Sequence, residues 1–206
     1  MRIDSVSQAP DRSGRYLVKF SDGSSMRLYR QTVEDFRMYP GMEVDTLDAI
    51  RERNSRYSAK MRAVRIVSAS AVSKRDLETR LVRKGESEEQ AKAAVQWLEE
   101  LNLVDDRTTA QQIVERCIHK GYGLQRAKQA LYEKQIPKAL WEEALEDYPD
   151  QTERIVDFLR TKLRDPEDPR QVRRAIAAAL RRGHSYGEVK RALERIGTES
   201  DFEEEY

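Results

Sequence analysis

The side chains of this sequence that are best suited to binding a partner are cations that recur at one position relative to a turn. Three of them each stand one residue before a turn-like position, and they are Lys84, Lys134 and Arg182. Such cations can bind an acidic protein surface or the phosphates of a nucleic acid. A cation is also favoured at the C-terminus of a helix, where the helix dipole contributes about 0.3–1 kcal/mol without any partner. The pattern therefore predicts either a repeated contact with an acidic partner or a repeated helix end.

Further basic residues surround these three positions and complete the set of candidate contacts. They are Arg75, Arg80 and Arg83 in the first region, Arg126 and Lys128 in the second, and Arg173, Arg174, Arg181, Lys190 and Arg191 in the third. Four arginines fall within residues 173–182, so we expect the third region to be the main contact surface. The alternative is that these charges form solvated helix faces.

Residues for covalent catalysis or metal binding do not form any recognisable motif. The sequence has no GxxxxGK[ST] phosphate loop, and its single cysteine, Cys117, lies in an apolar pattern typical of a core. His119 and His184 lie neither in a ligand-spaced cluster nor in a pattern with a plausible Ser or Cys nucleophile, and both are expected at the surface near helix ends. The glycines of "KGYGLQ" at 120–125 favour a turn between helices. We therefore expect a protein that is not an enzyme and needs no metal or cofactor.

The net charge of +1 conceals alternating charged blocks. Residues 51–85 hold eleven Lys/Arg against three Asp/Glu, and residues 86–109 hold two against seven. The same alternation follows at 110–138, 139–157 and 158–195, with net charges of +4, −6 and +6, before an acidic end. Each stretch of about fifty residues thus pairs a basic part with an acidic part, which favours acidic partners for the basic blocks.

The elements that must position these cations form an internal repeat anchored at Gly85, Gln135 and Gly183. Apolar residues recur at the same offsets from each anchor, with spacings of three and four that place them on one helix face. In the order of the three copies they are Leu77, Ala127 and Ala175; Leu81, Leu131 and Ala179; Ala91, Trp141 and Val189; Ala94, Ala144 and Ala192. Ser87, Pro137 and Ser185 follow as helix-start residues. The unit is three helices, repeated three times.

Residues 1–50 have a strand-like pattern instead of a helical one. Apolar and polar residues alternate in "RYLVKF" and "SMRLYR", and the two segments are joined through Asp22-Gly23, a hairpin signal. A short helix is expected near "TVEDFRMY". We predict a mainly α protein, an elongated array of three tandem three-helix repeats behind a small β-rich N-terminal module. The predicted parts are 1–50 for the module, 58–105, 106–148 and 149–197 for the repeats, and 198–206 for an acidic tail.

The apolar content argues against a membrane location. Residues with charged side chains make up 36% of the chain, and no apolar run approaches the roughly 20 residues that span a bilayer. The N-terminal "MRIDSVSQAP" lacks the apolar core of a signal peptide. We expect a cytoplasmic protein, and a monomer.

The repeated helices, with "LNLVDD" at 101–106 and "GYGLQRAKQALYEKQIP" at 121–137, resemble the RecX family of regulatory proteins. The resemblance covers about residues 58–197, and the β-rich start resembles an extension that some members carry. The chain keeps Asp105-Asp106, Gly121, Gly123, Leu131 and Ile136 of the family pattern. It departs from the pattern with Gln135 in place of glycine and with Thr108-Thr109 in place of an aromatic residue.

This resemblance implies a function in regulating the recombinase RecA. Members of the family bind RecA and its nucleoprotein filament and restrain its ATP hydrolysis, strand exchange and co-protease functions. The partners implied are thus RecA, free and in the filament, together with single- and double-stranded DNA as further candidates. Two alternatives remain open, a direct DNA-binding protein with helix-turn-helix-like repeats and an adaptor array without affinity for DNA.

Overall fold

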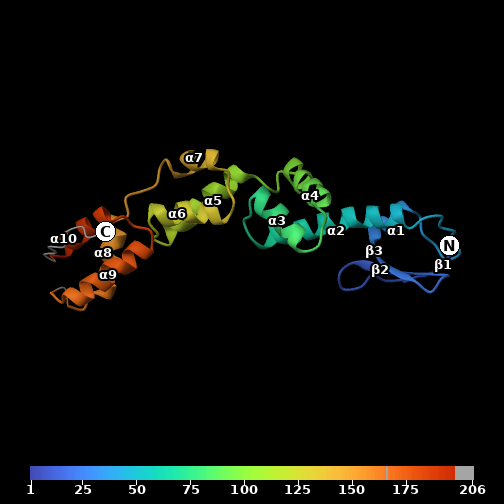
Figure 1. Cartoon of the computed structure of the whole chain (residues 1–206), viewed down its shortest axis with the longest axis horizontal. Coiled ribbons are helices and arrows are strands. Elements are labelled where there is room, and N and C mark those ends of the chain that lie inside the picture. The colour runs from blue at the N-terminus through green and yellow to red at the C-terminus, as the bar shows by residue number, and fades with distance from the viewer. Residues whose placement is uncertain (166, 198–206) are drawn as a thin grey trace. The chain divides into compact units, whose positions relative to one another are not determined.

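The structure is a computed structural model that describes residues 1–165 and 167–197 (Figure 1). The chain divides into two units, Met1–Val104 and Asp105–Tyr206. Both units are built mainly of helices, and a small antiparallel sheet begins the first, which confirms the predicted fold class. The predicted acidic tail at 198–206 lies outside the described residues.

The sheet of the first unit has the strand order β1-β2-β3, with β1 at Ile3–Val6, β2 at Arg15–Phe20 and β3 at Ser25–Tyr29. The predicted hairpin is confirmed, because β2 pairs antiparallel with β3 across Asp22-Gly23 and Gly23 takes a φ of +81°. Alternation buries Val18, Phe20 and Leu28. The predicted short helix is α1, at Arg30–Asp35.

A single long helix, α2 at Asp48–Ala69, takes part in two cores of the first unit. Its Ile50 packs with the sheet residues, whereas Ala59 and Ala63 pack with α3 and α4 of the first repeat. Helix α3 spans Lys74–Arg83 and α4 spans Glu88–Glu100, and each begins at a serine N-cap, Ser73 or Ser87. The N-terminal module and the first repeat are thus joined by continuous helix.

Burial in the first repeat follows the predicted apolar positions. Leu77 and Leu81 are fully buried, and Ala91 and Ala94 are buried in the same apolar cluster. Each fully buried leucine contributes roughly 2 kcal/mol of transfer free energy. The apolar stripe therefore fixes how α3 and α4 pack against α2.

The second unit contains the other two repeats. In one, α5 at Asp106–His119 and α6 at Leu124–Glu133 are followed by the 3₁₀ turn η1 at Lys138–Leu140 and the short α7 at Trp141–Leu145. In the other, α8 at Thr152–Lys162, α9 at Pro169–Arg181 and α10 at Tyr186–Ile196 pack together. Each repeat has its own apolar cluster. Ser185 caps α10 with a complete capping box.

The three repeat anchors share one backbone conformation. Gly85 and Gly183 have φ values of +92° and +87°, and Gln135 takes the same left-handed region with a φ of +54°. An L-residue pays roughly 1–2 kcal/mol there, a cost that glycine avoids. Gln135 therefore adopts the same turn as the two glycines, and the packing of α5–α7 around it offsets the conformational free energy that this costs.

The structure tests the predicted positions of the cysteine and of the two histidines. Cys117 is buried in α5, which confirms the prediction of a core residue. The prediction that both histidines lie at the surface is right for His119 but wrong for His184, which is only 4% exposed. His184 follows the anchor Gly183 and is covered because the preceding repeat packs over this turn.

Candidate anion-binding surfaces

The predicted basic residues divide among three different environments: an open groove in the first unit, a seam between the two repeats of the second unit, and exposed helix faces. The first environment contains Arg80 and Lys84. They line a groove of about 510 Å³ together with three arginines absent from the predicted set, Arg15, Arg62 and Arg65. The groove thus collects five cations from β2, α2 and the end of α3.

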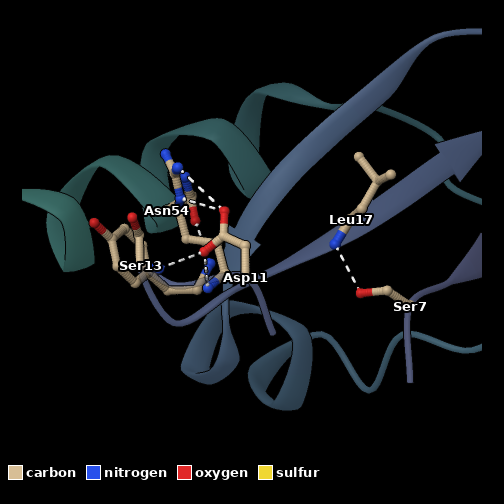
Figure 2. Close-up of polar contacts among 7 residues, drawn as sticks. Ser7, Asp11, Ser13, Leu17 and Asn54 are labelled. Atoms are coloured by element: carbon tan, nitrogen blue, oxygen red, sulfur yellow. Dashed lines mark hydrogen bonds and ion pairs between the residues drawn. The ribbon is translucent and has the colours of Figure 1, made fainter. Parts of the chain in front are cut away.

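The sheet wall of this groove is held by a local hydrogen-bond network (Figure 2). Asp11 accepts hydrogen bonds from the backbone N–H groups of Ser13 and Arg15 at 2.8 and 3.0 Å, and its carboxylate lies 3.2 Å from the Arg15 guanidinium. The backbone hydrogen bond from Arg15 is the main cause that lowers the pKa of Asp11. Asn54 of α2 accepts from the backbone N–H of Tyr29 at 2.8 Å. Hence Arg15 and Tyr29 are fixed beside α2.

The helical wall of this groove is held by ion pairs. Arg62 Nε lies 3.0 Å from Glu86 Oε1, and the Glu86 side chain is only 5% exposed. Arg62 also donates to the backbone carbonyl of Lys84, at the end of α3. Arg80 Nε lies 2.9 Å from Asp76 Oδ1 within α3. These pairs set the direction of the guanidinium groups.

The remaining candidate residues of the first and second repeats lie outside this groove. Arg75 and Arg83 are exposed on α3 and do not line the groove. On α6, Arg126 is half-buried and lies 3.1 Å from Glu133, which lowers the pKa of that carboxyl chiefly through this hydrogen bond. Lys128 and Lys134 are also half-buried. The three candidates of the second repeat are therefore less exposed than Arg75 and Arg83 of the first.

The seam of the second unit forms where the turn before α6 meets the turn before α10. The backbone N–H of Gly123 donates to the Arg182 carbonyl at 2.9 Å, and that of Gln125 donates to the Gly183 carbonyl at 3.1 Å. A Cβ atom on Gly123 would lie 2.1 Å from the Gly183 oxygen. Backbone thus meets backbone directly, which only glycine permits at this position.

Arg182 belongs to this seam. Its Nη2 atom donates to the carbonyl of Lys120 at 2.5 Å, at the C-terminal end of α5. Its guanidinium carbon lies 5.0 Å from the centre of the Tyr122 ring and 4.8 Å from that of Phe158. Arg154 of α8 also donates to this helix end, at the carbonyls of Ile118 and His119. The two arginines therefore compensate the unpaired carbonyls of α5.

Buried titratable groups complete the seam. His184 Nε2 lies 3.2 Å from the carbonyl of Gly121, to which it donates as the Nε2–H tautomer. Burial lowers the pKa of His184, so the ring stays neutral. The Tyr148 hydroxyl donates to the Tyr122 carbonyl at 2.7 Å, and burial raises its pKa to about 12. The seam is thus uncharged apart from its arginines.

The third environment is the surface of the third repeat. Arg173, Arg174 and Arg181 are exposed and fall within about 100° of one another around α9, as helical spacing requires. The opposite side of α9 buries Val172 and Ala175. Lys190 and Arg191 are exposed on α10. This repeat therefore keeps five of the six cations predicted for it at the surface.

Sequence reasoning missed Arg15, Arg62 and Arg65 because they do not recur at a repeat position and come from two separate elements. The available signal was the net charge of +8 over residues 51–85, which includes two of the three. No group of three or more His, Cys, Asp or Glu residues within 1–165 and 167–197 is arranged to hold a metal ion. Over the same ranges, every helix is too short or too polar to cross a membrane.

Comparisons with known proteins agree with the predicted resemblance. A family model described as the second three-helix domain of RecX matches residues 105–145, which hold α5 to α7. A regulatory protein RecX from Chlorobaculum tepidum is 30% identical over 153 residues, covering 72% of this chain and 95% of that protein. One from Clostridioides difficile is 25% identical over 202 residues, covering 94% of this chain and 95% of that protein.

A solved structure extends the likeness to the fold. The crystal structure of a regulatory protein RecX superposes with a TM-score of 0.63 at 21% identity, and the match covers 94% of this chain and 98% of that one. Because so little of the chain is left out, the match includes most of the β-rich module at residues 1–50. Most of residues 1–50 therefore have counterparts in that solved structure.

Proposed function

Because the chain belongs to the RecX family of regulatory proteins, we propose that it binds the recombinase RecA and its nucleoprotein filament and restrains their activities. The activities concerned are ATP hydrolysis, strand exchange and co-protease function. The observation that carries the proposal is the 30% identity to a regulatory protein RecX over 95% of that relative's length. The protein acts as a cytoplasmic monomer without catalysis of its own.

The charges of the surface support this mode of action. Exposed arginines on α9 and the lysine and arginine of α10 can meet acidic side chains of a partner or phosphates within the filament. Tandem repeats allow several modest contacts to act together, because linking them raises the effective concentration of each. An inhibitor of a filament therefore needs no deep pocket.

The test is the hydrolysis of ATP by RecA on single-stranded DNA, measured as this protein is added. We expect hydrolysis to fall at amounts below one protein per RecA. A variant with Arg173, Arg174 and Arg181 changed to glutamate should lose most of this inhibition. Arg182 is left unchanged because its contacts hold the seam of the second unit together.

A matched control reverses the same amount of charge elsewhere. Arg12, Lys19 and Lys92 are exposed in the first unit, outside the predicted contact set, and their change to glutamate should leave inhibition within about twofold of the wild type. If the wild type leaves hydrolysis unchanged but binds DNA with a steep salt dependence, the proposal fails and the direct DNA binder replaces it.

A further inference from the structure

The groove of the first unit is a binding site with a definable ligand. Its lining contains four arginines and one lysine, and none of the described residues that line it is acidic. We propose that this groove binds the sugar–phosphate backbone of a nucleic-acid strand. The N-terminal sheet thereby supplies one wall of a binding site, in addition to packing against α2.

The first step of the argument is that the groove is preorganised. Arg15, Arg62 and Arg80 are each held by a carboxylate of Asp11, Glu86 or Asp76, at 3.2, 3.0 and 2.9 Å. A guanidinium has five N–H donors, and one carboxylate occupies two at most. The arginines are therefore fixed in place and still have donors for an anion, so binding costs little side-chain entropy.

The second step concerns the charge that the groove leaves uncompensated. Arg65 and Lys84 also line it, both are exposed, and neither forms an ion pair with any residue in the described ranges. They come from the C-terminal half of α2 and the C-cap of α3. A polyanion that enters the groove would therefore gain attraction to these two cations without first breaking an ion pair of the protein.

The third step selects the class of anion. Four of the residues that line the groove belong to α2, whose backbone groups are already hydrogen-bonded within the helix, so this wall cannot pair with an extended peptide as a sheet edge does. A phosphodiester strand carries its acceptors on its own backbone, and arginine forks match phosphate oxygens in two-point hydrogen bonds. Tyr29, Ile66 and Ala69 add apolar surface for sugars or bases.

The experiment measures binding of a fluorescent oligonucleotide by anisotropy, as a single strand and as a duplex of the same sequence, with no RecA present. The variant R65A/K84A removes the two cations that lack an ion-pair partner in the described ranges. We expect it to bind about tenfold more weakly at low salt and to lower the salt slope by roughly 1.4 for the single strand. Because RecA is absent, this outcome is independent of the proposed function.

The matched control is K19A/K92A, which removes two exposed cations of the same unit outside the groove and should bind within about twofold of the wild type. Thermal unfolding checks that both variants remain folded. A selective loss for the single strand places that strand in the groove, and an equal loss for the duplex places one backbone of the duplex there. Equal binding by the two variants, or competition by a polyglutamate peptide as strong as that by unlabelled oligonucleotide, overturns the proposal.

Discussion

Lys84 of the first unit and Arg182 of the second stand at the same place in the repeat, one residue before a left-handed turn, and they serve different ends. Lys84 is exposed at the rim of a groove. Arg182 is folded into a seam, where it donates to the end of α5 and lies against two aromatic rings. A repeat position therefore fixes a residue's place in its own helix, while the neighbouring element determines what the residue contacts.

The difference has a physical cause in what each turn meets. In the second unit, the turn at Gly183 packs directly on the turn at Gly123, so the unpaired carbonyls at the end of α5 lie within reach of Arg182. In the first unit, the carbonyl of Lys84 is itself an acceptor, from Arg62 of α2. A Cβ atom on Gly85 would have no neighbour within 4 Å among the described residues, apart from those adjoining it in the chain. Lys84 is thus left available to solvent.

The largest effect is expected where the seam has no room. The substitution Gly123→Ala would place a Cβ atom 2.1 Å from the Gly183 oxygen and 2.4 Å from the His184 nitrogen. Since both are backbone atoms, the two repeats must separate, and we expect the second unit to lose about 3 kcal/mol or more. Urea unfolding followed by Trp141 fluorescence, with Trp97 replaced by phenylalanine, measures this loss.

The comparison for that measurement is Gly187→Ala in α10, where the new Cβ atom would lie 3.9 Å from the end of the Arg191 side chain, an ordinary van der Waals contact. Alanine favours a helix over glycine by about 1 kcal/mol, so this variant should be as stable as the wild type or slightly more stable. A Gly123→Ala protein whose unfolding free energy lies within about 1 kcal/mol of the wild type would show that the seam is not closed in solution.

An intermediate effect is expected from the two equivalent cations. Arg182→Ala removes donation to the Lys120 carbonyl and the contacts with Tyr122 and Phe158, and should destabilise the second unit by about 2 kcal/mol. Lys84→Ala should change the stability of the first unit by no more than about 0.5 kcal/mol, because Lys84 is exposed. Chemical unfolding of both variants checks the contrast, and equal losses would refute it.

The smallest effect is a pH dependence confined to the second unit. Burial lowers the pKa of His184, so the unfolded chain takes up a proton near pH 6.5 before the folded chain does. The contribution of neutral His184 to the free energy of unfolding should therefore be fully present above pH 6.5 and should decline as the pH falls below it. His184→Gln should flatten this part of the profile, whereas His119→Gln, at an exposed position, should preserve it. Unfolding free energies measured from about pH 7.5 to about pH 5 supply the comparison.

The sequence predicts the helices and their buried faces well because these depend on local periodicity. Leu77, Leu81 and Leu131 recur at helical spacing, and all three are fully buried. The hairpin follows equally from the local signal at Asp22-Gly23. Where the information is contained within one or two turns of chain, spacing alone is sufficient.

The candidate site was less predictable because it depends on contacts between distant segments. Arg15 and Arg65 are fifty residues apart and line one groove, and no repeat or motif links them. The sequence predicts a surface position for His184, which is buried only because the chain at the end of α5 packs over it. The positive φ of Gln135 is visible only through the alignment of the repeats, since glutamine by itself does not signal a left-handed turn.

Helix α2 determines how the first unit must come apart. A helix of 22 residues extends about 33 Å, and it contributes Ile50 to the sheet core and Ala63 to the repeat core. If α2 unfolds, apolar surface becomes exposed in the sheet core and in the repeat core together. The two cores should therefore unfold in one cooperative transition. Amides in the middle of α2 should then exchange with solvent only when the whole unit unfolds. A truncation at residue 50 would leave both halves without a shared support.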